Sequence, residues 1–366
     1  MRLDHLTFTR FLAALTVVIF HYGSHLAPFN IQPFDQIFQA GPIAVSYFYA
    51  LSGFIMAIAY YRPQQPKNFN RWKYWLARFA RIYPVYLLAL LLVFFANYTK
   101  TDNAIGQLLL NLSMLQAWVP SYPLSLNSPG WSLSVEAFFY LCFPIFLWMI
   151  YRGGLKLLML LSILLWLATQ LLHTYWLNSP EYIPLNAIHD FIYYNPLMHL
   201  NTFLAGLMVG ILFQEKLIHR PPSRYNNFWL LFTMVLISVL LMSRPSFKVW
   251  FGVDIDYTNG LIAPLFLLFI VLLARSQGII VSLLAMPSLV LLGEASYSLY
   301  ILQRPVYGIY HNYIAKHLSV SELWHFYFYL LLLISISIAS YKLFETPLRQ
   351  WINTRVSWQK NSVNSA

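Results

Sequence analysis

The stretches "VYLLALLLVFFANY" (85–98) and "FYFYLLLLISISIAS" (326–340) decide the fold class of this 366-residue chain. Both are continuously apolar, and similar runs of seventeen to twenty-five residues recur along the sequence. A helix of about 20 apolar residues crosses a bilayer, whereas membrane β-barrels show short segments of alternating hydrophobicity. Hydrophobic residues make up 59% of the chain and charged residues 10%, which excludes a soluble domain. The sequence therefore predicts an all-α membrane bundle.

Length and polarity predict about ten transmembrane helices, at residues 5–26, 41–61, 81–98, 131–151, 155–177, 197–214, 227–243, 258–275, 286–309 and 323–343. The stretch "AIGQLLLNLSMLQAW" (104–118) is too polar at Gln107, Asn111 and Gln116 for a span, and we expect an interfacial or re-entrant helix there. No linker or internal repeat is visible. We expect one transmembrane domain over 1–350 and a short polar cytoplasmic tail over 351–366.

The basic residues predict the orientation, because cytoplasmic loops retain Lys and Arg. With the N terminus inside, 17 basic residues are cytoplasmic and 4 are outside, and both termini are cytoplasmic. The cytoplasmic set is Arg2, Arg62, Lys67, Arg71, Lys73, Arg78, Arg81, Arg152, Lys156, Lys216, Arg220, Arg224, Arg275, Lys342, Arg349, Arg355 and Lys360; the outer set is Lys100, Arg244, Lys248 and Lys316. The +11 net charge is thus mostly a topology signal, and a nucleic-acid partner is not expected.

Arg10 and His21 lie in the first apolar run, "TRFLAALTVVIFHYGSH" (9–25). A charge inside hydrocarbon costs about 2.5–3.5 kcal/mol, so each such residue needs a partner, a polar cavity or a function. Eleven residues at about 100° each bring the two side chains to nearly the same helix face, about 16 Å apart along the axis. They can line one cavity at two depths. The alternative is an arginine that extends to the cytoplasmic interface and a hydrogen-bonded core histidine.

His25 follows His21 at a spacing that zinc sites also use. No carboxylate or cysteine is close in sequence, so we expect no metal and place His25 at the helix end. The single cysteine, Cys142, lies inside a predicted span and cannot form an internal disulfide.

Glu136 enters the fourth span in "WSLSVEAFFY" (131–140), about 8 Å below Trp131. We expect His21 at a similar distance below the outer end of its own helix, so the two could meet. A carboxylate beside an imidazole fixes its tautomer and raises its basicity. The alternative is that Glu136 caps the helix that Ser132 opens.

Arg78 and Arg81 lie three residues apart in "RFARIYPVY" (78–86), at the expected cytoplasmic start of the third span. Guanidinium groups bind phosphate with two parallel hydrogen bonds, so this pair suits a phosphate-rich ligand. The alternative is simple anchoring at the cytoplasmic interface. Pro84 fits the first turn of a helix, which would place the arginines on a preceding interfacial helix.

The ninth predicted span contains a polar stripe in "SYSLYILQRPVY" (296–307). Tyr297, Tyr300 and Arg304 lie on one side of the helix, and Pro305 is expected to kink it. Such a stripe serves helix packing as often as a site. In "FETPLR" (344–349), Glu345 is expected to pair with a cytoplasmic arginine.

Together these motifs resemble the membrane acyltransferase-3 family, which acylates bacterial surface polysaccharides and lipids. The resemblance rests on six matches in the family's order over almost the whole chain: "RFLAALTVVIFH" (10–21), "FYALSGF" (48–54), "RFARIYP" (78–84), "WSLSVE" (131–136), "SYSLY" (296–300) and "FETP" (344–347). Many members have a histidine where this chain has Gln303. The hydrolase-like domain that follows the membrane part in some members is not in this sequence.

The resemblance implies a multi-pass enzyme of the bacterial inner membrane. It would transfer an acyl group, most simply acetyl, from cytoplasmic acyl-CoA to a hydroxyl of an extracytoplasmic polysaccharide or lipid-linked glycan, with no permanently bound cofactor. We assign Arg10, Arg78 and Arg81 to the donor, and His21 with Glu136 to removal of the hydroxyl proton. Ser52, Ser132, Tyr297 and Tyr300 are supporting polar residues, and membrane lipid is the surrounding partner.

Two other classes of function remain open from the sequence. A proton-coupled transporter or flippase would use His21 and Glu136 as a proton relay, but such proteins usually have repeated halves. A scaffold whose polar residues only join helices would tolerate His21→Gln.

Overall fold

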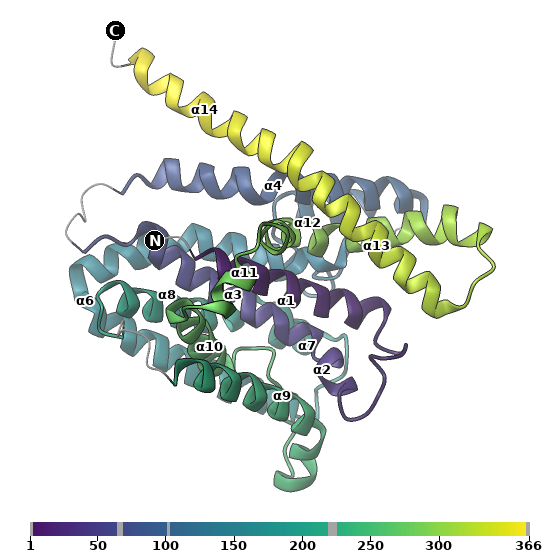
Figure 1. Ribbon diagram of the computed structural model, residues 1–366, viewed down its shortest axis with the longest axis horizontal. Helices are drawn as coiled ribbons and strands as arrows, with labels where there is room; N and C mark the ends of the chain where they lie inside the picture. The colour runs from purple at the N-terminus through teal and green to yellow at the C-terminus, as the bar shows by residue number, and fades with distance from the viewer. Residues whose placement is uncertain (1–2, 64–68, 101–102, 219–224, 364–366) are drawn as a thin grey trace. The chain divides into compact units, whose positions relative to one another are not determined.

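A computed structural model describes residues 3–63, 69–100, 103–218 and 225–363, with side chains placed as far as Thr354 except that of Lys100. The described residues form helices joined by turns, with no strand (Figure 1). The α-helices are α1 (Asp4–Tyr22), α2 (Asp35–Gln39), α3 (Gly41–Tyr60), α4 (Arg71–Asn97), α5 (Ala104–Leu112), α6 (Trp131–Leu177), α7 (Ala187–Tyr194), α8 (Pro196–Gln214), α9 (Asn226–Phe251), α10 (Ala263–Arg275), α11 (Ile279–Leu284), α12 (Pro287–Ile309), α13 (Glu322–Ser340) and α14 (Thr346–Val363).

Every predicted span overlaps a helix, which confirms the all-α class. Two of the predicted spans, 131–151 and 155–177, fall in α6, which Gly154 interrupts at a φ of 74°. Only glycine adopts that conformation without a steric penalty. In the described residues, seven helical segments are long and apolar enough to cross a membrane, and α10 is a shorter apolar helix. Ten crossings and two cytoplasmic termini remain predictions.

Several residues of the predicted charge pattern cannot be placed. Arg2, Lys67, Arg220 and Arg224 lie outside the described residues, as do the side chains of Lys100, Arg355 and Lys360.

Residue contacts divide the chain into two compact units. Unit 1 combines Met1–Pro66 with Ile145–Glu294, and unit 2 combines Lys67–Pro144 with Ala295–Ala366. The chain passes from one unit to the other inside α6 and inside α12.

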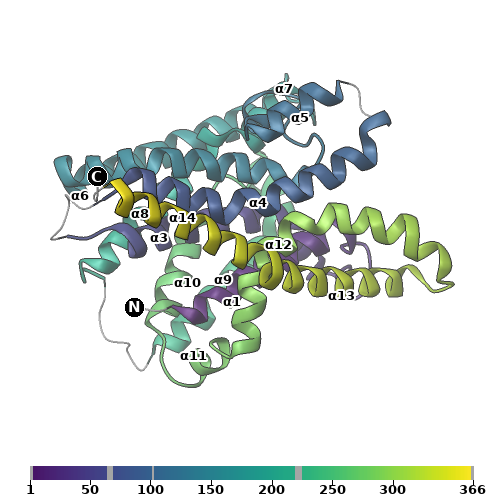
Figure 2. The same ribbon diagram turned by 90° about the horizontal axis from the view of Figure 1, so that it is seen from above.

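Unit 1 is built on the close packing of α3 against α8, which run side by side (Figures 1 and 2). Small residues allow this approach, as is usual in membrane bundles. A Cβ atom at Gly53 would lie 2.1 Å from the Phe203 carbonyl oxygen, and one at Gly206 would lie 2.2 Å from the Ala50 carbonyl oxygen. The backbones therefore touch directly, and neither position has room for a side chain.

In unit 1, α1 packs against α3 and against the first residues of α12. A Cβ atom at Gly41, the first residue of α3, would lie 2.3 Å from Phe20 Cβ, so the end of α1 meets the start of α3. Near the other end of α1, a Cβ at Gly293 would lie 2.2 Å from the Thr7 carbonyl oxygen. These two contacts fix α1 at both of its ends.

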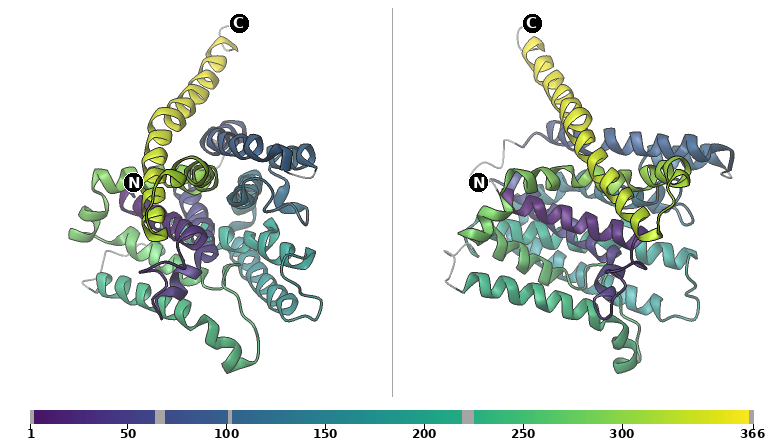
Figure 3. Two further views of the ribbon diagram at one scale, coloured as in Figure 1. Left: turned by 90° about the vertical axis from the view of Figure 1, so that its right-hand side faces the viewer. Right: turned by 45° about the vertical axis from the view of Figure 1, so that its right-hand side comes forward.

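Unit 2 contains α4, α5, the first part of α6 and the C-terminal helices. α13 continues through a π-helical turn, Tyr341–Glu345, into α14, and together they form one long helix that ends at Val363 (Figure 3). α14 packs along α4. The predicted polar tail from residue 351 is thus part of α14, which begins at Thr346.

The polar stretch 104–118 forms α5 and a short 3-10 turn, and two of its polar side chains lie inside the protein. Asn111 and Gln116 are fully buried. Asn111 donates to Ser125 Oγ at 2.9 Å, and Gln116 donates to the Tyr86 hydroxyl at 3.1 Å and to the Gly130 carbonyl at 2.9 Å. Asn111 and Gln116 therefore serve packing inside unit 2, and the interfacial or re-entrant placement of this stretch remains a prediction.

Candidate active site

Arg10 and His21 lie in one uninterrupted helix of unit 1, so their predicted common face follows from the geometry of α1. Thr9 Oγ1 lies 2.5 Å from the Tyr47 hydroxyl of α3. The Arg10 guanidinium is close enough to the same hydroxyl to act on it electrostatically. The Arg10 side chain is half-buried. The chemical roles of both residues remain predictions.

His21 lies in the last turn of α1, which corrects the expected depth. The prediction placed the helix end near residue 26 and His21 about five residues below it. Instead α1 ends at Tyr22, and the Gly23 N–H caps it by donating to the Ile19 carbonyl at 2.7 Å. His21 is exposed and packs edge-on against Phe20, so it is not a core histidine. His25 follows in a turn outside the helix.

Ser52 lies in the middle of α3, half-buried and next to Gly53, where α3 touches α8. The signature "FYALSGF" therefore includes a glycine whose place is fixed by helix packing.

Arg78, Arg81 and Glu136 come together in unit 2 around Tyr140. The Tyr140 hydroxyl donates a hydrogen bond to Glu136 Oε1 one turn away on α6. The Arg78 guanidinium lies 5.8 Å from the centre of the Tyr140 ring, and both arginines act electrostatically on the Tyr140 hydroxyl. Trp75 Nε1 donates to the Tyr140 carbonyl at 3.1 Å and joins α4 to α6 at this level. Two cations, one carboxylate and a phenol thus share one site.

The predicted start of the helix that carries Arg78 and Arg81 is wrong. α4 begins at Arg71, where the Asn70 side chain caps it by accepting from the Lys73 N–H. Pro84 therefore lies in the helix interior and not in its first turn. From Arg71, Arg78 and Arg81 lie about 10–15 Å along the helix axis. They belong to the same continuous helix as the third predicted span, and not to a separate interfacial helix.

Ser132, Tyr297 and Tyr300 border the same part of unit 2. The Ser132 and Tyr300 hydroxyls are 2.8 Å apart, and Ser132 Oγ also donates to the Pro129 carbonyl at 2.9 Å. The Tyr297 hydroxyl donates to the Ile82 carbonyl of α4. These bonds hold α12 against α4 and the start of α6, which gives the predicted polar stripe a packing role.

Gln303 and Glu345 complete this surrounding layer. Gln303, which replaces the common family histidine, is fully buried and donates to the Tyr300 carbonyl at 2.7 Å. Glu345 is 3% exposed, with Ser298 Oγ at 3.4 Å.

The structure thus sorts the predicted residues into two groups. Arg10, His21 and Ser52 belong to unit 1. Arg78, Arg81, Glu136, Ser132, Tyr297 and Tyr300 belong to unit 2. Glu136, which was predicted beside His21, is grouped with the two arginines, and its pairing with His21 remains a prediction.

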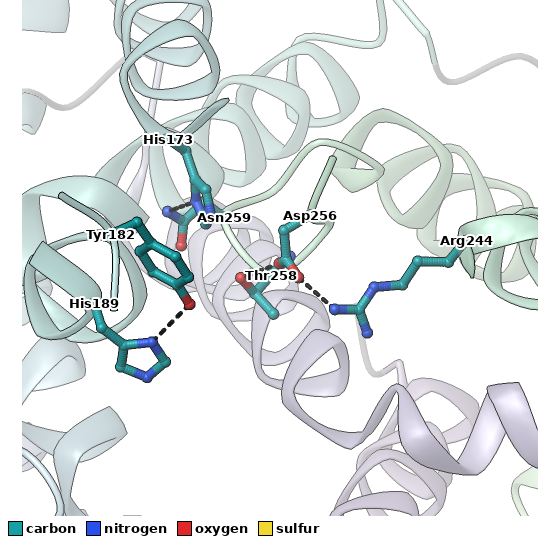
Figure 4. Close-up of polar contacts among 7 residues, drawn as sticks. All are labelled: His173, Tyr182, His189, Arg244, Asp256, Thr258 and Asn259. Atoms are coloured by element: carbon teal, nitrogen blue, oxygen red, sulfur yellow. Dashed lines mark hydrogen bonds and ion pairs between the residues drawn. The ribbon is translucent and has the colours of Figure 1, made fainter. Parts of the chain in front are cut away.

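The sequence reasoning missed Tyr140 and a polar cluster in unit 1. Tyr140 follows Glu136 at the spacing of four that places two side chains on one helix face, and this signal was available. The second omission, shown in Figure 4, involves His173, His189 and Asn259, which come from three separate segments. Their convergence has no local sequence signal. Among the described residues, no group of three His, Cys, Asp or Glu side chains is arranged to hold a metal ion.

Comparison with known proteins defines the class. The family model described as "Acyltransferase domain" matches residues 3–342, and the chain belongs to this family of multi-pass membrane proteins. The chain is 32% identical over 160 residues to Acyltransferase MdmB of Streptomyces mycarofaciens, which covers 40% of this chain and 39% of that protein. No solved structure matches the chain.

Two staphylococcal proteins align over nearly the whole chain. SAR0937 of Staphylococcus aureus strain MRSA252 and SACOL0978 of strain COL, both named as candidate O-acetyltransferases, are each 22% identical over 372 aligned positions. Each alignment covers 97% of this chain and 58% of the relative. The chain therefore spans little more than half the length of these relatives.

Proposed function

We propose that the protein is a membrane O-acyltransferase that moves an acyl group, most simply acetyl, from acyl-CoA to a hydroxyl of an extracytoplasmic polysaccharide or lipid-linked glycan. The observation that carries the proposal is the family match over residues 3–342, which includes Arg10 and His21 on one helix. The names of the relatives agree with acyl transfer to oxygen.

The arginine group of unit 2 is the candidate donor site. Coenzyme A carries several phosphates, and a guanidinium fork binds phosphate through two charge-assisted hydrogen bonds. Arg78 and Arg81 have a carboxylate and a phenol at Glu136 and Tyr140 beside them. These neighbours limit the rotamers of the arginines, so less side-chain entropy is lost on binding. Under the predicted orientation, α4 begins on the cytoplasmic side, where acyl-CoA is made available.

His21 is the candidate general base. A neutral imidazole removes the proton of the acceptor hydroxyl as its oxygen attacks the thioester carbonyl, and the thiol of coenzyme A then leaves with a proton. The C–O bond of the ester forms while the C–S bond breaks. Arg10, on the same face of α1, is placed to stabilise negative charge on the thioester oxygen or on a donor phosphate. His21 is exposed at the end of its helix, which leaves its ring accessible to an acceptor.

The test is transfer of a radiolabelled acetyl group from acetyl-CoA to cell-surface glycans. Wild type and His21→Gln are expressed at matched membrane levels in a host that lacks the gene. Glutamine keeps hydrogen bonding but cannot take a proton, so we expect transfer to fall by about 100-fold or more. Acetyl-CoA binding by the purified proteins is the control, and we expect it to be unchanged.

Equal transfer by the two proteins would contradict the assignment of His21. If wild type labels no glycan or lipid, the proposed acyl transfer is wrong, and coupled movement of a solute and protons would then favour a transporter.

A further inference from the structure

Two connections meet at one end of unit 1: the one from α6, which ends at Leu177, to α7, which begins at Ala187, and the one from α9 to α10. Asn178 joins them, since its side chain donates to the Asp254 carbonyl and accepts from the Asp254 N–H, both at 2.9 Å. Figure 4 shows polar side chains from both connections. We call the side chains of His173, Tyr182, His189, Tyr193 and Asn259 the outer cluster. None of them has a role in the mechanism above.

The buried part of the outer cluster is the pair of His173 and Asn259, which are 3% and 1% exposed. Asn259 Nδ2 donates to the Ile192 carbonyl and also lies against His173 Nδ1. The Ile192 carbonyl needs a donor, so the Asn259 atom beside it is the amide nitrogen and not the oxygen. The same nitrogen donates to His173 Nδ1, which is therefore unprotonated, and the ring proton is on Nε2.

Two polar atoms of this pair are left over. His173 Nε2 and Asn259 Oδ1 are buried and make no hydrogen bond to any residue that the structure describes. A buried polar atom without a partner costs about 1–3 kcal/mol, and native proteins keep few of them without a reason. One atom is a donor and the other an acceptor. Together they match a hydroxyl group, which both donates and accepts.

The half-buried part of the outer cluster is aromatic. The Tyr182 hydroxyl lies 3.0 Å from His189 Nδ1, and the His189 ring stacks at a tilt on Tyr193 with centroids 4.6 Å apart. Tyr193 in turn meets His173 edge to face at 5.1 Å. Burial raises the pKa of the Tyr182 hydroxyl; a hydrogen bond with Tyr193 opposes this rise and the carboxylates of Asp256 and Asp254 add to it, so Tyr182 remains a neutral phenol. Aromatic faces with a few placed polar groups are typical of small-ligand sites.

The charges around the outer cluster argue against an anionic ligand. Residues 178–195 and 252–262 contain no lysine or arginine, whereas Asp190 lies in α7 next to His189. Arg244 reaches the site from α9, but it is paired with Asp256 at 2.6 Å. Lys248 is paired with Asp254, also at 2.6 Å. Both of these cations, which lie within the described part of the chain, are thus already paired with carboxylates, so a neutral ligand fits better than a phosphate or carboxylate.

The outer cluster and His21 lie at the same end of unit 1. Ser46 of α3 donates a hydrogen bond to the Thr258 carbonyl, next to Asn259. Ser46 is five residues, or about 8 Å, from Gly41, which touches Phe20 beside His21. An extended ligand that binds the outer cluster therefore enters at the end of the unit where α1 presents its histidine.

From this geometry we propose that the outer cluster binds a neutral sugar ring of the acceptor, with hydroxyls on His173 and Asn259 and the C–H face of the ring on Tyr193 and His189. The inference rests on the proposed acyl transfer to a glycan. It adds the class of ligand that the site recognises, an uncharged ring with several hydroxyls, and the residues that bind it. The residues of the outer cluster do not contact the reacting atoms in this proposal, so they are binding residues and not catalytic residues.

The experiment uses the full chain in lipid nanodiscs. The probe is total surface polysaccharide extracted from cells in which the gene is deleted. Binding is followed by intrinsic tryptophan fluorescence, to which all 12 tryptophans contribute, with Trp166 and Trp176 on the part of α6 that carries His173. We compare wild type with His189→Ala, Tyr193→Leu and Tyr182→Phe. The matched control is Tyr175→Ala, which removes a ring of α6 that is 66% exposed.

We expect His189→Ala and Tyr193→Leu to weaken polysaccharide binding at least tenfold, and Tyr182→Phe by about threefold because only a hydroxyl is lost. Acetyl-CoA binding and the control variant should match wild type. In the transfer assay the loss should appear in KM for the polysaccharide and not in kcat.

Wild-type binding of polysaccharide by both His189→Ala and Tyr193→Leu would overturn the proposal, as would a failure of wild type to bind it. If wild type binds the polysaccharide but transfers no acetyl group, the proposed enzymatic function is wrong while the binding site stands.

Discussion

The two units of the protein handle polar groups in opposite ways. In unit 2 the central polar group is charged, with Arg78, Arg81 and Glu136 around Tyr140 in the body of α4 and α6. In unit 1 the outer cluster lies where helices end, and the charged residues beside it form ion pairs, Arg244 with Asp256 and Lys248 with Asp254.

This difference matches the two kinds of substrate that an acyltransferase must hold. A polyanionic donor requires fixed cations, and these are expensive inside a membrane unless aromatic rings and a carboxylate support them. A neutral, hydroxyl-bearing acceptor requires neutral donors and acceptors. The following predictions treat unit 2 as donor-binding and unit 1 as the unit of the base and the acceptor.

The largest expected effect on activity comes from a substitution in unit 1. Arg10→Leu removes the cation that shares a face with His21, and we expect kcat to fall by about 100-fold because charge in the transition state is no longer stabilised. Single-turnover transfer from labelled acetyl-CoA measures it, with Arg10→Lys as the charge-retaining control. A loss in acetyl-CoA affinity with unchanged kcat would instead assign Arg10 to the donor phosphates.

Arg81→Lys tests the donor role of unit 2. Lysine keeps the charge but lacks the fork, so we expect KM for acetyl-CoA to rise by about tenfold with little change in kcat. Steady-state kinetics at several acetyl-CoA concentrations measures this. Wild-type kinetics would leave the arginines with a purely topological role.

Variants of Glu136 test most directly whether this carboxylate acts with the arginines of unit 2 or with His21 of unit 1. If it belongs to the donor group, Glu136→Ala should raise KM for acetyl-CoA about fivefold, because Tyr140 and the arginines lose a neighbour that orients them. Glu136→Gln, which still accepts from Tyr140, should have a smaller effect. A changed pH profile of kcat in either variant would instead support the predicted pairing with His21.

Gly206→Ala affects the scaffold of unit 1. The added methyl group would meet the Ala50 carbonyl at 2.2 Å, so α8 must move away from α3. Overpacking of this kind costs about 1–3 kcal/mol, and we expect a lower Tm in detergent with acetyl-CoA binding retained in the folded fraction. Gly252→Ala is a useful contrast, because a Cβ there meets nothing within 4 Å and only its φ of 69° is unfavourable.

The smallest effect is expected for Tyr140→Phe. The ring that packs beside Arg78 remains, and only the hydroxyl that donates to Glu136 is lost. We expect a two- to threefold rise in KM for acetyl-CoA. A larger loss, confined to kcat, would show that the phenol contacts the reacting atoms.

Much of the fold was predictable because the membrane imposes it. Apolar runs must become helices in hydrocarbon, so helices stand at all ten predicted positions. Helix ends were less predictable: Pro84 was assigned to a first turn, whereas α4 begins at Arg71, thirteen residues before that proline, with Asn70 as its cap. The partners of polar residues were also not predictable, because a buried Gln116 with two hydrogen-bond partners looks the same in sequence as one that faces lipid headgroups.

The sequence by itself determined the helical membrane class, the shared face of Arg10 and His21, and the family signatures, since each depends on composition or on spacing within one helix. The tertiary structure alone decided that Glu136 is grouped with the arginines through Tyr140, and that His173, His189 and Asn259 converge from three segments. Contacts between distant segments depend on how helices pack, and helix packing leaves no periodic trace in the sequence.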